Sequence, residues 1–568
     1  MTTISGGEAV YRVLCEQNVK TVFGLLGGSM LELYDALYLG KKISYVGARD
    51  ERSAGHMADA YARITGGPGV VLGAQAGPGV VNLATAVAEA HLAYSPLVVI
   101  AGAVSRQDLG RDTFQEIDQV ALFAPISKRS IAVFEPSGLT AAVRDAIRTA
   151  LSGRPGPVVL HVPRDLFRAD VEPASPEPVR IARAGPPAPE DIASIIALLG
   201  KACRPVILAG GGFKPGPASR ALVRLAETTG IPVVTSTGHA DIMPHDHALN
   251  AGQTGPRGNR VAGRLTREAD LILAVGTRLG FNSTFFSNQY VSPSADIVHI
   301  DIEASAAGRY FPASLCIQAD ARESARALAS QIEQHGPDSA EWAAWSESFL
   351  REREELLEER SAESENAAIP LHPTRAFGEI RDALPRDAIV TLDTGNACLA
   401  AADRLAHFNS PGLITPLDFG LVGFGYAAAL GARAAAPDRP VVSIIGDGGF
   451  GYTMAEITTA VRHRLPVVAI VLDNGAWGAE KAYQQNFFDG RLIGSEIDSP
   501  PFDEVASLCG AKGYAVDRPG QLGATLAEAL ESGEPAVIHV KIDPAALSPL
   551  RRDLFRSASG AGPAEGDR

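Results

Sequence analysis

Short apolar runs alternate with longer amphipathic stretches along almost the whole chain. In residues 1–170 the runs are TVFGLL, GVVLGA, PLVVIAG and GPVVLHV, and each is bounded by Gly or Pro. Strands that helices cover on both faces have this composition, because neither face of the strand meets water. The pattern therefore predicts βαβ units and a parallel sheet in this block.

The same rhythm returns in two further blocks, with runs such as PVILAGGG and LILAVGTR, then PVVSIIGDGG and PVVAIVLDNG. A Pro- and Ala-rich stretch without periodicity separates the first two blocks, and a densely charged stretch with apolar residues at helical spacing separates the last two. The first is typical of an exposed linker and the second of a solvated helix. We predict an α/β protein with three doubly wound parallel-sheet domains, divided as follows: an N-terminal domain (1–170), a linker (171–190), a central domain (191–338), a helical connector (339–369), a C-terminal domain (370–548) and a tail (549–568).

Composition narrows the class of protein. The chain has 568 residues, enough for about three domains, and 51 Lys and Arg against 65 Asp and Glu give a net charge of -14. This charge disfavours binding to nucleic acid or to an anionic membrane, so we expect small-molecule partners. The five cysteines show no metal-binding spacing, and the chain has no signal-peptide pattern and no run of about 18 uncharged apolar residues. We expect a soluble, cytoplasmic protein with buried, reduced thiols.

The most specific chemical signal is in the third block. The run PVVSII leads directly into Gly446, Asp447, Gly448 and Gly449, and the run PVVAIVLD leads into Asn474. Ligand crevices of open α/β sheets lie at the carboxyl ends of the strands, and a divalent ion bridging a diphosphate prefers oxygen ligands. Asp447 and Asn474 are therefore candidate metal ligands, and the glycines allow the backbone to approach phosphate oxygens.

This arrangement resembles the diphosphate and magnesium motif of thiamine diphosphate enzymes. A second family pattern, a glutamate followed by Ala-Asp-x-Tyr-x-Arg, is matched from Glu51 to Arg63. The resemblance extends over nearly the whole chain, including TVFGLLGGSMLELYDAL, AGPGVVNLATAV and LDFGLVGFGYAAALGA, and is to the acetolactate synthase-like branch. It implies thiamine diphosphate and Mg²⁺ as cofactors, with a pyrimidine-binding N-terminal domain and a diphosphate-binding C-terminal domain.

The resemblance also implies roles for single residues. Glu51 would be the activating carboxylate, which bonds to a ring nitrogen of the cofactor and promotes loss of the C2 proton; the alternative is a helix N-terminal acid. The other implied positions are Gly395 and Asn396 at the diphosphate, Gly420 and Val422 under the cofactor, Gln115 in the active site, and Ala476 beside Asp447 and Asn474 at the metal. Val422 as a helix-packing residue and Gln115 as a satisfied polar residue are the alternatives.

Glu51 and the glycine-rich motif lie in different predicted domains. Members of the family build each active site between two domains of different subunits, so the resemblance implies a homodimer or a homotetramer.

The central domain departs from the family pattern. FAD-binding relatives have a polar D-D-R type segment where this chain has Leu279-Gly280-Phe281-Asn282, and this departure argues against FAD. The segment Gly210–Lys214 follows a predicted strand and is a candidate site for the ADP part of CoA, with a structural turn as the alternative.

The choice of substrate depends on the segments Asn474–Lys481, FFDGRLIGSEID and LSPLRRDLF, which resemble sulfoacetaldehyde acetyltransferases. Those enzymes convert sulfoacetaldehyde and phosphate to acetyl phosphate and sulfite, so they must bind two anions. The candidate cations are Lys481, Arg491, Arg551 and Arg552. For each of them the alternative is a surface cation without a role in binding.

The second hypothesis is a 2-hydroxyacyl-CoA lyase, which yields formyl-CoA and an aldehyde or ketone. Glu496 would then exchange the proton of the substrate hydroxyl. In a transferase Glu496 would instead order water or phosphate. The alternative to both roles is a loop carboxylate exposed to solvent. The segments DERSAG and AQAGPG depart from the transferase pattern. A third hypothesis is an acetolactate synthase-like carboligase. A noncatalytic binding protein is disfavoured because Glu51, Asp447 and Asn474 occur together.

Overall fold

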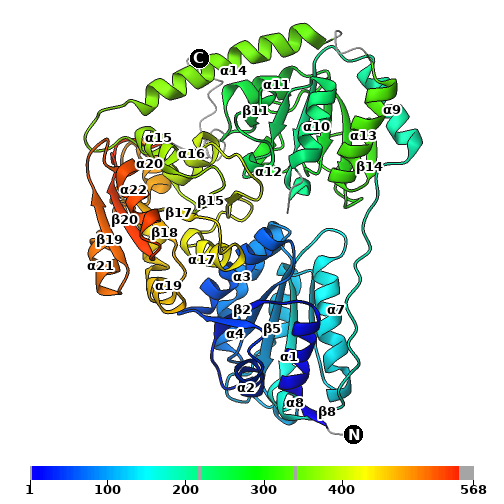
Figure 1. Ribbon diagram of the computed structural model, residues 1–568, viewed down its shortest axis with the longest axis vertical. Helices are drawn as coiled ribbons and strands as arrows, with labels where there is room; N and C mark the ends of the chain where they lie inside the picture. Colours follow the sequence, from blue (N-terminus) through cyan, green and yellow to red (C-terminus); the bar gives the residue numbers. More distant parts are fainter. Residues whose placement is uncertain (1–2, 215–218, 338–341, 549–568) are drawn as a thin grey trace.

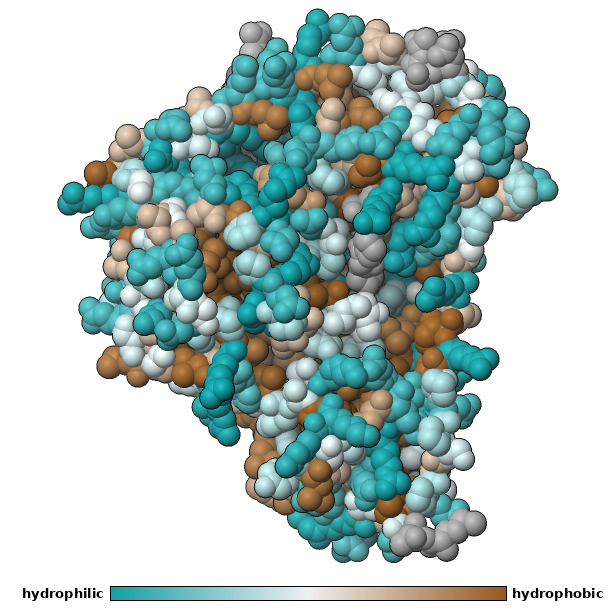
Figure 2. All heavy atoms as spheres, in the orientation of Figure 1, coloured by the Kyte–Doolittle hydropathy of each residue, from teal (hydrophilic) through white to brown (hydrophobic). Residues whose placement is uncertain are grey.

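The structure is a computed structural model that describes residues 3–214, 219–337 and 342–548. Its three largest sheets each contain six parallel strands, and helices cover both faces of each sheet (Figure 1). This confirms the predicted fold class. Polar and charged side chains cover most of the face in Figure 2, where apolar residues form scattered patches.

The first sheet lies in the N-terminal domain, and its alternating residues face opposite layers of helices. Val70 packs with α1 (Gly6–Glu16) and α7 (Leu139–Leu151), while Val71 packs with α3 (Glu51–Thr65) and α5 (Ala84–Leu92). Both faces are therefore dry, as the doubly apolar runs require. In sheet order the strands are β3 (Ser44–Gly47), β2 (Thr21–Leu25), β4 (Gly69–Gly73), β5 (Leu97–Ala103), β7 (Val158–Pro163) and β6 (Arg129–Ala132).

The central sheet has the strand order typical of dinucleotide-binding folds, in which the order reverses between its first and fourth strands. In sheet order the strands are β11 (Asn250–Gln253), β10 (Val233–Thr235), β9 (Pro205–Ala209), β12 (Leu271–Val275), β13 (Asp296–Asp301) and β14 (Leu315–Gln318). Its main helices are α9 (Pro189–Leu199), α10 (Ser219–Thr229), α11 (Arg260–Glu268) and α13 (Ala321–His335).

The C-terminal sheet carries the glycine-rich motif. In sheet order its strands are β16 (Leu413–Ile414), β15 (Ile389–Leu392), β17 (Val441–Gly446), β18 (Val468–Asp473), β20 (Ala536–Lys541) and β19 (Lys512–Val516). One face is covered by α15 (Pro373–Ala383), α16 (Asn396–Arg404) and α22 (Leu522–Glu531). The other face is covered by α17 (Gly425–Ala435), α19 (Ile457–His463) and α21 (Phe502–Leu508).

The N- and C-terminal domains share one hydrophobic core, because α3 packs directly against α17 (Figure 1). Gly431 allows this contact: a Cβ atom there would lie 1.9 Å from the carbonyl oxygen of Met57. Beside it, the Arg63 guanidinium bonds to Asp59 at 2.6 Å, to Glu89 at 2.8 Å and to the carbonyl oxygen of Thr415 at 2.8 Å. The middle and the last turn of α3 are thus fixed relative to the C-terminal domain.

A long helix, α14 (Ala343–Ser364), connects the central domain to the C-terminal domain (Figure 1). At its central-domain end the Trp345 indole donates to the carbonyl oxygen of Pro205 at 3.1 Å. At the other end Arg360 forms an ion pair with Asp403. The charged stretch of the sequence is therefore mostly a solvated helix that is anchored at both ends.

The five cysteines lie in the described residues and all are free thiols, but the expectation that they are buried holds fully for one of them, and Cys15 and Cys509 are half-buried. Cys398 is buried, whereas Cys203 and Cys316 are exposed on the central domain. None of the helices described is both long enough and apolar enough to span a bilayer. Arg551 and Arg552 lie outside the described residues.

Candidate functional site

Three neighbouring strands of the C-terminal sheet deliver the predicted cofactor residues to one edge. β15 lies between β16 and β17, so the connection that leaves β15 leads to its neighbour on one side and the connection that leaves β17 leads to β18 on the other side. This divergence creates a crevice at the carboxyl ends of β15 and β17. Gly395 and Asn396 follow β15, Gly446 ends β17, and Asn474 follows β18. The topology therefore brings these residues together.

Glycines keep the backbone of this crevice open. A Cβ atom at Gly395, Gly420 or Gly446 would meet no atom within 4 Å, so a ligand can approach the main chain there. Gly448 and Gly449 are needed for another reason, because a Cβ at either would lie within 3 Å of Trp477 or of the Asp393 carboxylate. The arrangement fits a backbone cradle for an anionic group.

Asp447 is a buried acid at the centre of this edge, at the start of α18 (Asp447–Gly451). One carboxylate oxygen accepts a hydrogen bond from the Ser499 hydroxyl at 2.9 Å. Burial, together with the neighbouring Asp473 carboxylate, raises the pKa of Asp447 to about 6. A divalent cation would relieve this buried negative charge, so the donor chemistry fits Mg²⁺.

Asp473 shapes the turn that carries Asn474 and was not identified from the sequence. Its carboxylate accepts hydrogen bonds from the Gly475 amide at 2.8 Å and from His539 at 2.7 Å, and it pairs with Lys541. Although burial acts against ionisation, these donors hold the pKa of Asp473 below its usual range. The only sequence signal was an acid at the end of an apolar run.

Asn396 and Asn474 converge on Gly478. A Cβ atom there would lie 3.0 Å from the Asn474 amide nitrogen and 3.3 Å from the Asn396 Cβ. The Asn396 amide donates to the carbonyl oxygen of Ser548 at 2.7 Å. The last described residues of the chain therefore close over one side of the crevice.

An isolated antiparallel bridge holds Ala476 beside Asn474. Ala476 pairs with Glu496 in an antiparallel bridge, and the Trp477 amide donates to the carbonyl oxygen of Ser495 at 2.7 Å. The Lys481 ammonium contacts the Glu496 carboxylate at 2.9 Å; the lysine side chain is 12% exposed and the glutamate side chain 66%. An almost buried cation and an exposed acid therefore lie next to the predicted metal position.

The loop with Gly420 and Val422 is folded by Asp393, a second acid that the sequence analysis missed. The buried Asp393 carboxylate accepts hydrogen bonds from the amides of Gly423 at 3.0 Å and Gly425 at 3.5 Å. Burial raises the pKa of Asp393 to about 6. Its position directly after the run AIVTL was a usable signal, because an acid at a strand end is unusual.

Glu51 is the first residue of α3, and Asp50 caps this helix. The Glu51 carboxylate accepts a hydrogen bond from Asn82, the last residue of α4 (Pro78–Asn82), at 3.0 Å. Among the described residues Asn82 is its only hydrogen-bond partner. Within one chain, therefore, Glu51 is not hydrogen-bonded to the C-terminal domain.

Gln115 lies near the same edge of the N-terminal sheet as Glu51. Its side-chain oxygen accepts from the Gln75 amide at 2.5 Å, and Gln75 in turn accepts from the Gly28 amide at 2.9 Å. The Gln115 backbone has φ of +70°, and the Gly77 backbone packs against it. Gln75, in the segment AQAG, joins the candidate site through this contact.

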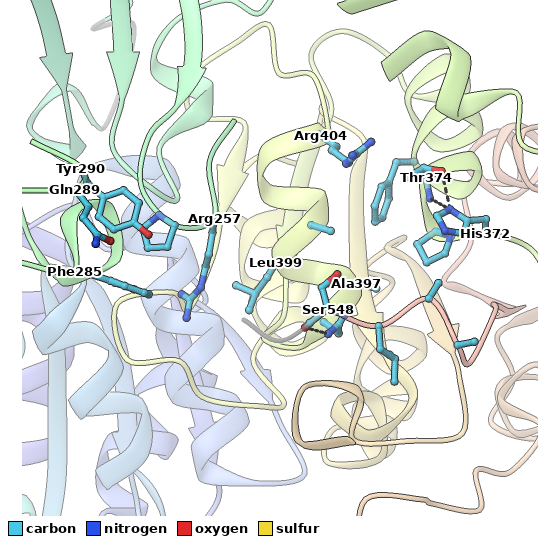
Figure 3. Close-up of a pocket in the computed structure, with 18 of the residues that line it drawn as sticks. Arg257, Phe285, Gln289, Tyr290, His372, Thr374, Ala397, Leu399, Arg404 and Ser548 are labelled. Atoms are coloured by element: carbon cyan, nitrogen blue, oxygen red, sulfur yellow. Dashed lines mark hydrogen bonds between the residues drawn. The ribbon is translucent and has the colours of Figure 1, made fainter. Parts of the chain in front are cut away.

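A cavity of about 890 Å³ opens between the central and C-terminal domains (Figure 3). Arg257, Phe285 and Tyr290 line it from the central domain, opposite Leu399 and Arg404 of α16. Asn396 and Ser548 also line it, so the cavity begins beside the crevice at the carboxyl end of β15 and extends along α16.

Two further cations, Arg491 of the candidate anion-binding set and Lys214 of the candidate nucleotide segment, are paired as Lys481 is. Arg491 forms an exposed pair with Asp489, and Lys214 bonds to the buried Asp241 at 2.7 Å. The glycine turn before Lys214 packs on Gly276, since a Cβ atom at Gly212 would lie 2.6 Å from the Gly276 Cα. These contacts favour a structural turn. The described residues contain no cluster of three or more His, Cys, Asp or Glu side chains arranged to hold a metal.

Models of three domain families match the chain. They are the thiamine pyrophosphate enzyme N-terminal TPP binding domain over residues 4–122, the central domain over 192–328, and the C-terminal TPP binding domain over 393–540.

Full-length relatives carry two different activities. A probable acetolactate synthase large subunit of Methanocaldococcus jannaschii is 33% identical over 563 residues, covering 96% of this chain and 93% of its own. The sulfoacetaldehyde acetyltransferase of Alcaligenes xylosoxydans xylosoxydans is 32% identical over 574 residues, covering 96% and 94%. The acetolactate synthase isozyme 2 large subunit of Escherichia coli is 32% identical over 546 residues, covering 95% and 96%. Overall identity therefore does not separate the two activities.

The first prediction concerns the metal site. Asp447→Ala should raise the dissociation constant of thiamine diphosphate in the presence of Mg²⁺ by about 100-fold or more, because it removes the charged metal ligand. Ser499→Ala, which only releases the carboxylate, should raise it about tenfold. Isothermal titration calorimetry measures both, with Asp489→Ala as an exposed-acid control. Unchanged affinity in Asp447→Ala would remove Asp447 from the metal site.

Proposed function

The chain belongs to the thiamine pyrophosphate enzyme family, in its acetolactate synthase branch, and from this premise we propose that it makes or breaks a bond next to a carbonyl carbon with the help of Mg²⁺. Thiamine diphosphate, when bound, supplies the carbon nucleophile for that reaction. The protein's task is to bind and orient the cofactor and to move protons.

The holding residues follow from the C-terminal crevice. Asp447 and Asn474 would hold Mg²⁺ through side-chain oxygens and Ala476 through its main-chain oxygen. Gly395, Asn396, Gly446, Gly448 and Gly449 would contact the diphosphate. The open backbone at Gly395 and Gly446 and the raised pKa of the buried Asp447 support this assignment.

Glu51 would hold and move the proton at a pyrimidine ring nitrogen. Glu51 is partly exposed, and within the described ranges only the Asn82 side chain hydrogen-bonds to its carboxylate. Gln115 would face the substrate from the same domain. Glu51 begins α3 and Gln115 lies in a loop, both near the carboxyl edge of the N-terminal sheet, which suits a shared site.

We further propose a homodimer or homotetramer in which each active site combines Glu51 of one subunit with Asp447 of the partner subunit, at different parts of one cofactor. Two large apolar side chains near this edge are exposed, Leu26 and Phe114, the latter by 83%. Exposed apolar residues beside a site that one chain leaves incomplete support burial against a second copy.

The substrate that the site supports best is sulfoacetaldehyde, with phosphate as acetyl acceptor. One observation carries this proposal: the almost buried Lys481 lies in the first turn of α20 (Gly478–Phe487), next to the antiparallel bridge that holds Ala476. A sulfonate and a phosphate each need a cation close to the reacting carbon. Glu496, paired with Lys481, would order phosphate or water.

A 2-hydroxyacyl-CoA lyase is the second candidate. The cavity of about 890 Å³ beside Asn396 is far larger than sulfoacetaldehyde requires and favours an extended substrate. Glu496, 66% exposed, would then exchange the proton of the substrate hydroxyl. Acetolactate synthase-like ligation is supported by relatives of equal identity.

The second prediction concerns Glu51. Glu51→Gln should lower kcat by about 10²–10⁴-fold, because the amide cannot take part in proton transfer. The fold should be preserved, as circular dichroism and the thermal midpoint would show. Glu8→Gln is a matched control, since Glu8 is also an acid in the first turn of a helix. Equal, small effects of both substitutions would leave Glu51 as a helix N-terminal acid only.

The third prediction concerns the substrate. The purified protein with thiamine diphosphate and Mg²⁺ should form acetyl phosphate from sulfoacetaldehyde and phosphate. In parallel, a 2-hydroxyacyl-CoA is tested for formyl-CoA and pyruvate for acetolactate. Formyl-CoA or acetolactate as the sole product would reject the transferase.

The cation is tested in the same assay. Lys481→Gln should raise the KM for sulfoacetaldehyde or phosphate about tenfold, the loss of one charge-assisted hydrogen bond. Arg491→Gln, which removes an exposed cation on the same loop, should leave KM unchanged.

A further inference from the structure

The central domain contacts the loop that carries Gly420 and Val422. This loop, residues 415–422, runs from β16 toward α17, and its far end is held by Asp393 of its own domain. Leu417, in its middle, packs in the hydrophobic core of the C-terminal domain, but among the described residues no side chain of that domain's sheet hydrogen-bonds to residues 416–419. The side-chain hydrogen bonds to the middle come from the segment that follows β12 of the central domain.

Two side chains of that segment bind the loop. The Asn282 amide donates to the carbonyl oxygen of Leu417 at 2.6 Å, and Arg278 forms a hydrogen-bonded ion pair with Asp418. Asp418 lies only two residues before Gly420. One neutral and one charge-assisted hydrogen bond therefore fix consecutive residues of the loop.

Both side chains are themselves held in place. The second nitrogen of the Arg278 guanidinium donates to the Tyr94 hydroxyl at 2.8 Å, and the guanidinium lies 5.0 Å from the centre of the Tyr94 ring. The Asn282 side-chain oxygen Oδ1 accepts from Arg257 at 3.0 Å. Gly280 leaves space for the arginine, since a Cβ atom there would lie 2.9 Å from its Nε. The segment is preorganised to bind the loop.

We propose that Arg278 and Asn282 are positioning residues, which clamp the loop 415–422 so that Gly420 and Val422 keep the conformation needed at the cofactor. This rests on the proposed placement of those two residues in the cofactor site. The central domain would then act directly on the active site, through Arg278 and through Asn282, the last residue of the Leu279–Asn282 segment that departs from the FAD-binding pattern.

The fourth prediction tests the clamp with two variants of similar shape, Arg278→Met and Asn282→Leu. Hydrogen–deuterium exchange of the cofactor-free protein should be faster in the peptide that covers residues 415–424. The dissociation constant of thiamine diphosphate with Mg²⁺ should rise about tenfold in each variant. The thermal midpoint should stay unchanged, and Arg278→Lys, which keeps the charge, should restore part of the affinity.

The matched control is Arg386→Met. Arg386 pairs with Asp246 at 2.7 Å across the same two domains, but both side chains are more than half exposed and neither contacts the loop. It should change neither exchange nor affinity. Unchanged exchange in Arg278→Met and Asn282→Leu, or an equal change in Arg386→Met, would overturn the clamp. Faster exchange with unchanged cofactor affinity would overturn the placement of Gly420 and Val422, and the positioning role with it.

Discussion

The reversal of strand order at β15 of the C-terminal sheet is the constraint on which the rest of the site depends. Parallel strands all have their carboxyl ends at one edge of the sheet, so the polar residues that follow β15, β17 and β18 lie side by side there. Asp447 is buried at this edge with Asp473 nearby, and the two acids give the edge a negative charge that a cation would balance. The glycines leave the backbone open where an anion would meet that cation.

The other two domains serve this edge. The N-terminal domain is fixed to it by the shared core of α3 and α17 and by the buried Arg63 contacts. The central domain contacts it through the loop before Val422 and through the cavity along α16. The three sheets are thus not independent units joined by linkers. Each one limits the conformations of the same few loops.

The sequence was sufficient for the fold class, because doubly apolar runs bounded by Gly and Pro leave little choice except covered parallel strands. It was also sufficient to propose Asp447, Asn474 and Glu51, whose spacing is local. Asp473 with His539, and Arg278 with Asp418, were missed for a physical reason. Their partners meet only through strand order and domain contacts, which periodicity along the chain does not encode. Gln75 was missed in the same way.

A crystal of the protein grown with thiamine diphosphate and Mn²⁺ in place of Mg²⁺ addresses the cofactor site itself. Mn²⁺ accepts the same oxygen ligands, and its anomalous scattering locates it without reference to the fold. We expect an anomalous peak between the Asp447 carboxylate and the Asn474 amide, with the diphosphate against Gly395 and Gly446. A bound cofactor whose metal peak lies away from Asp447 and Asn474 would contradict this structure of the site.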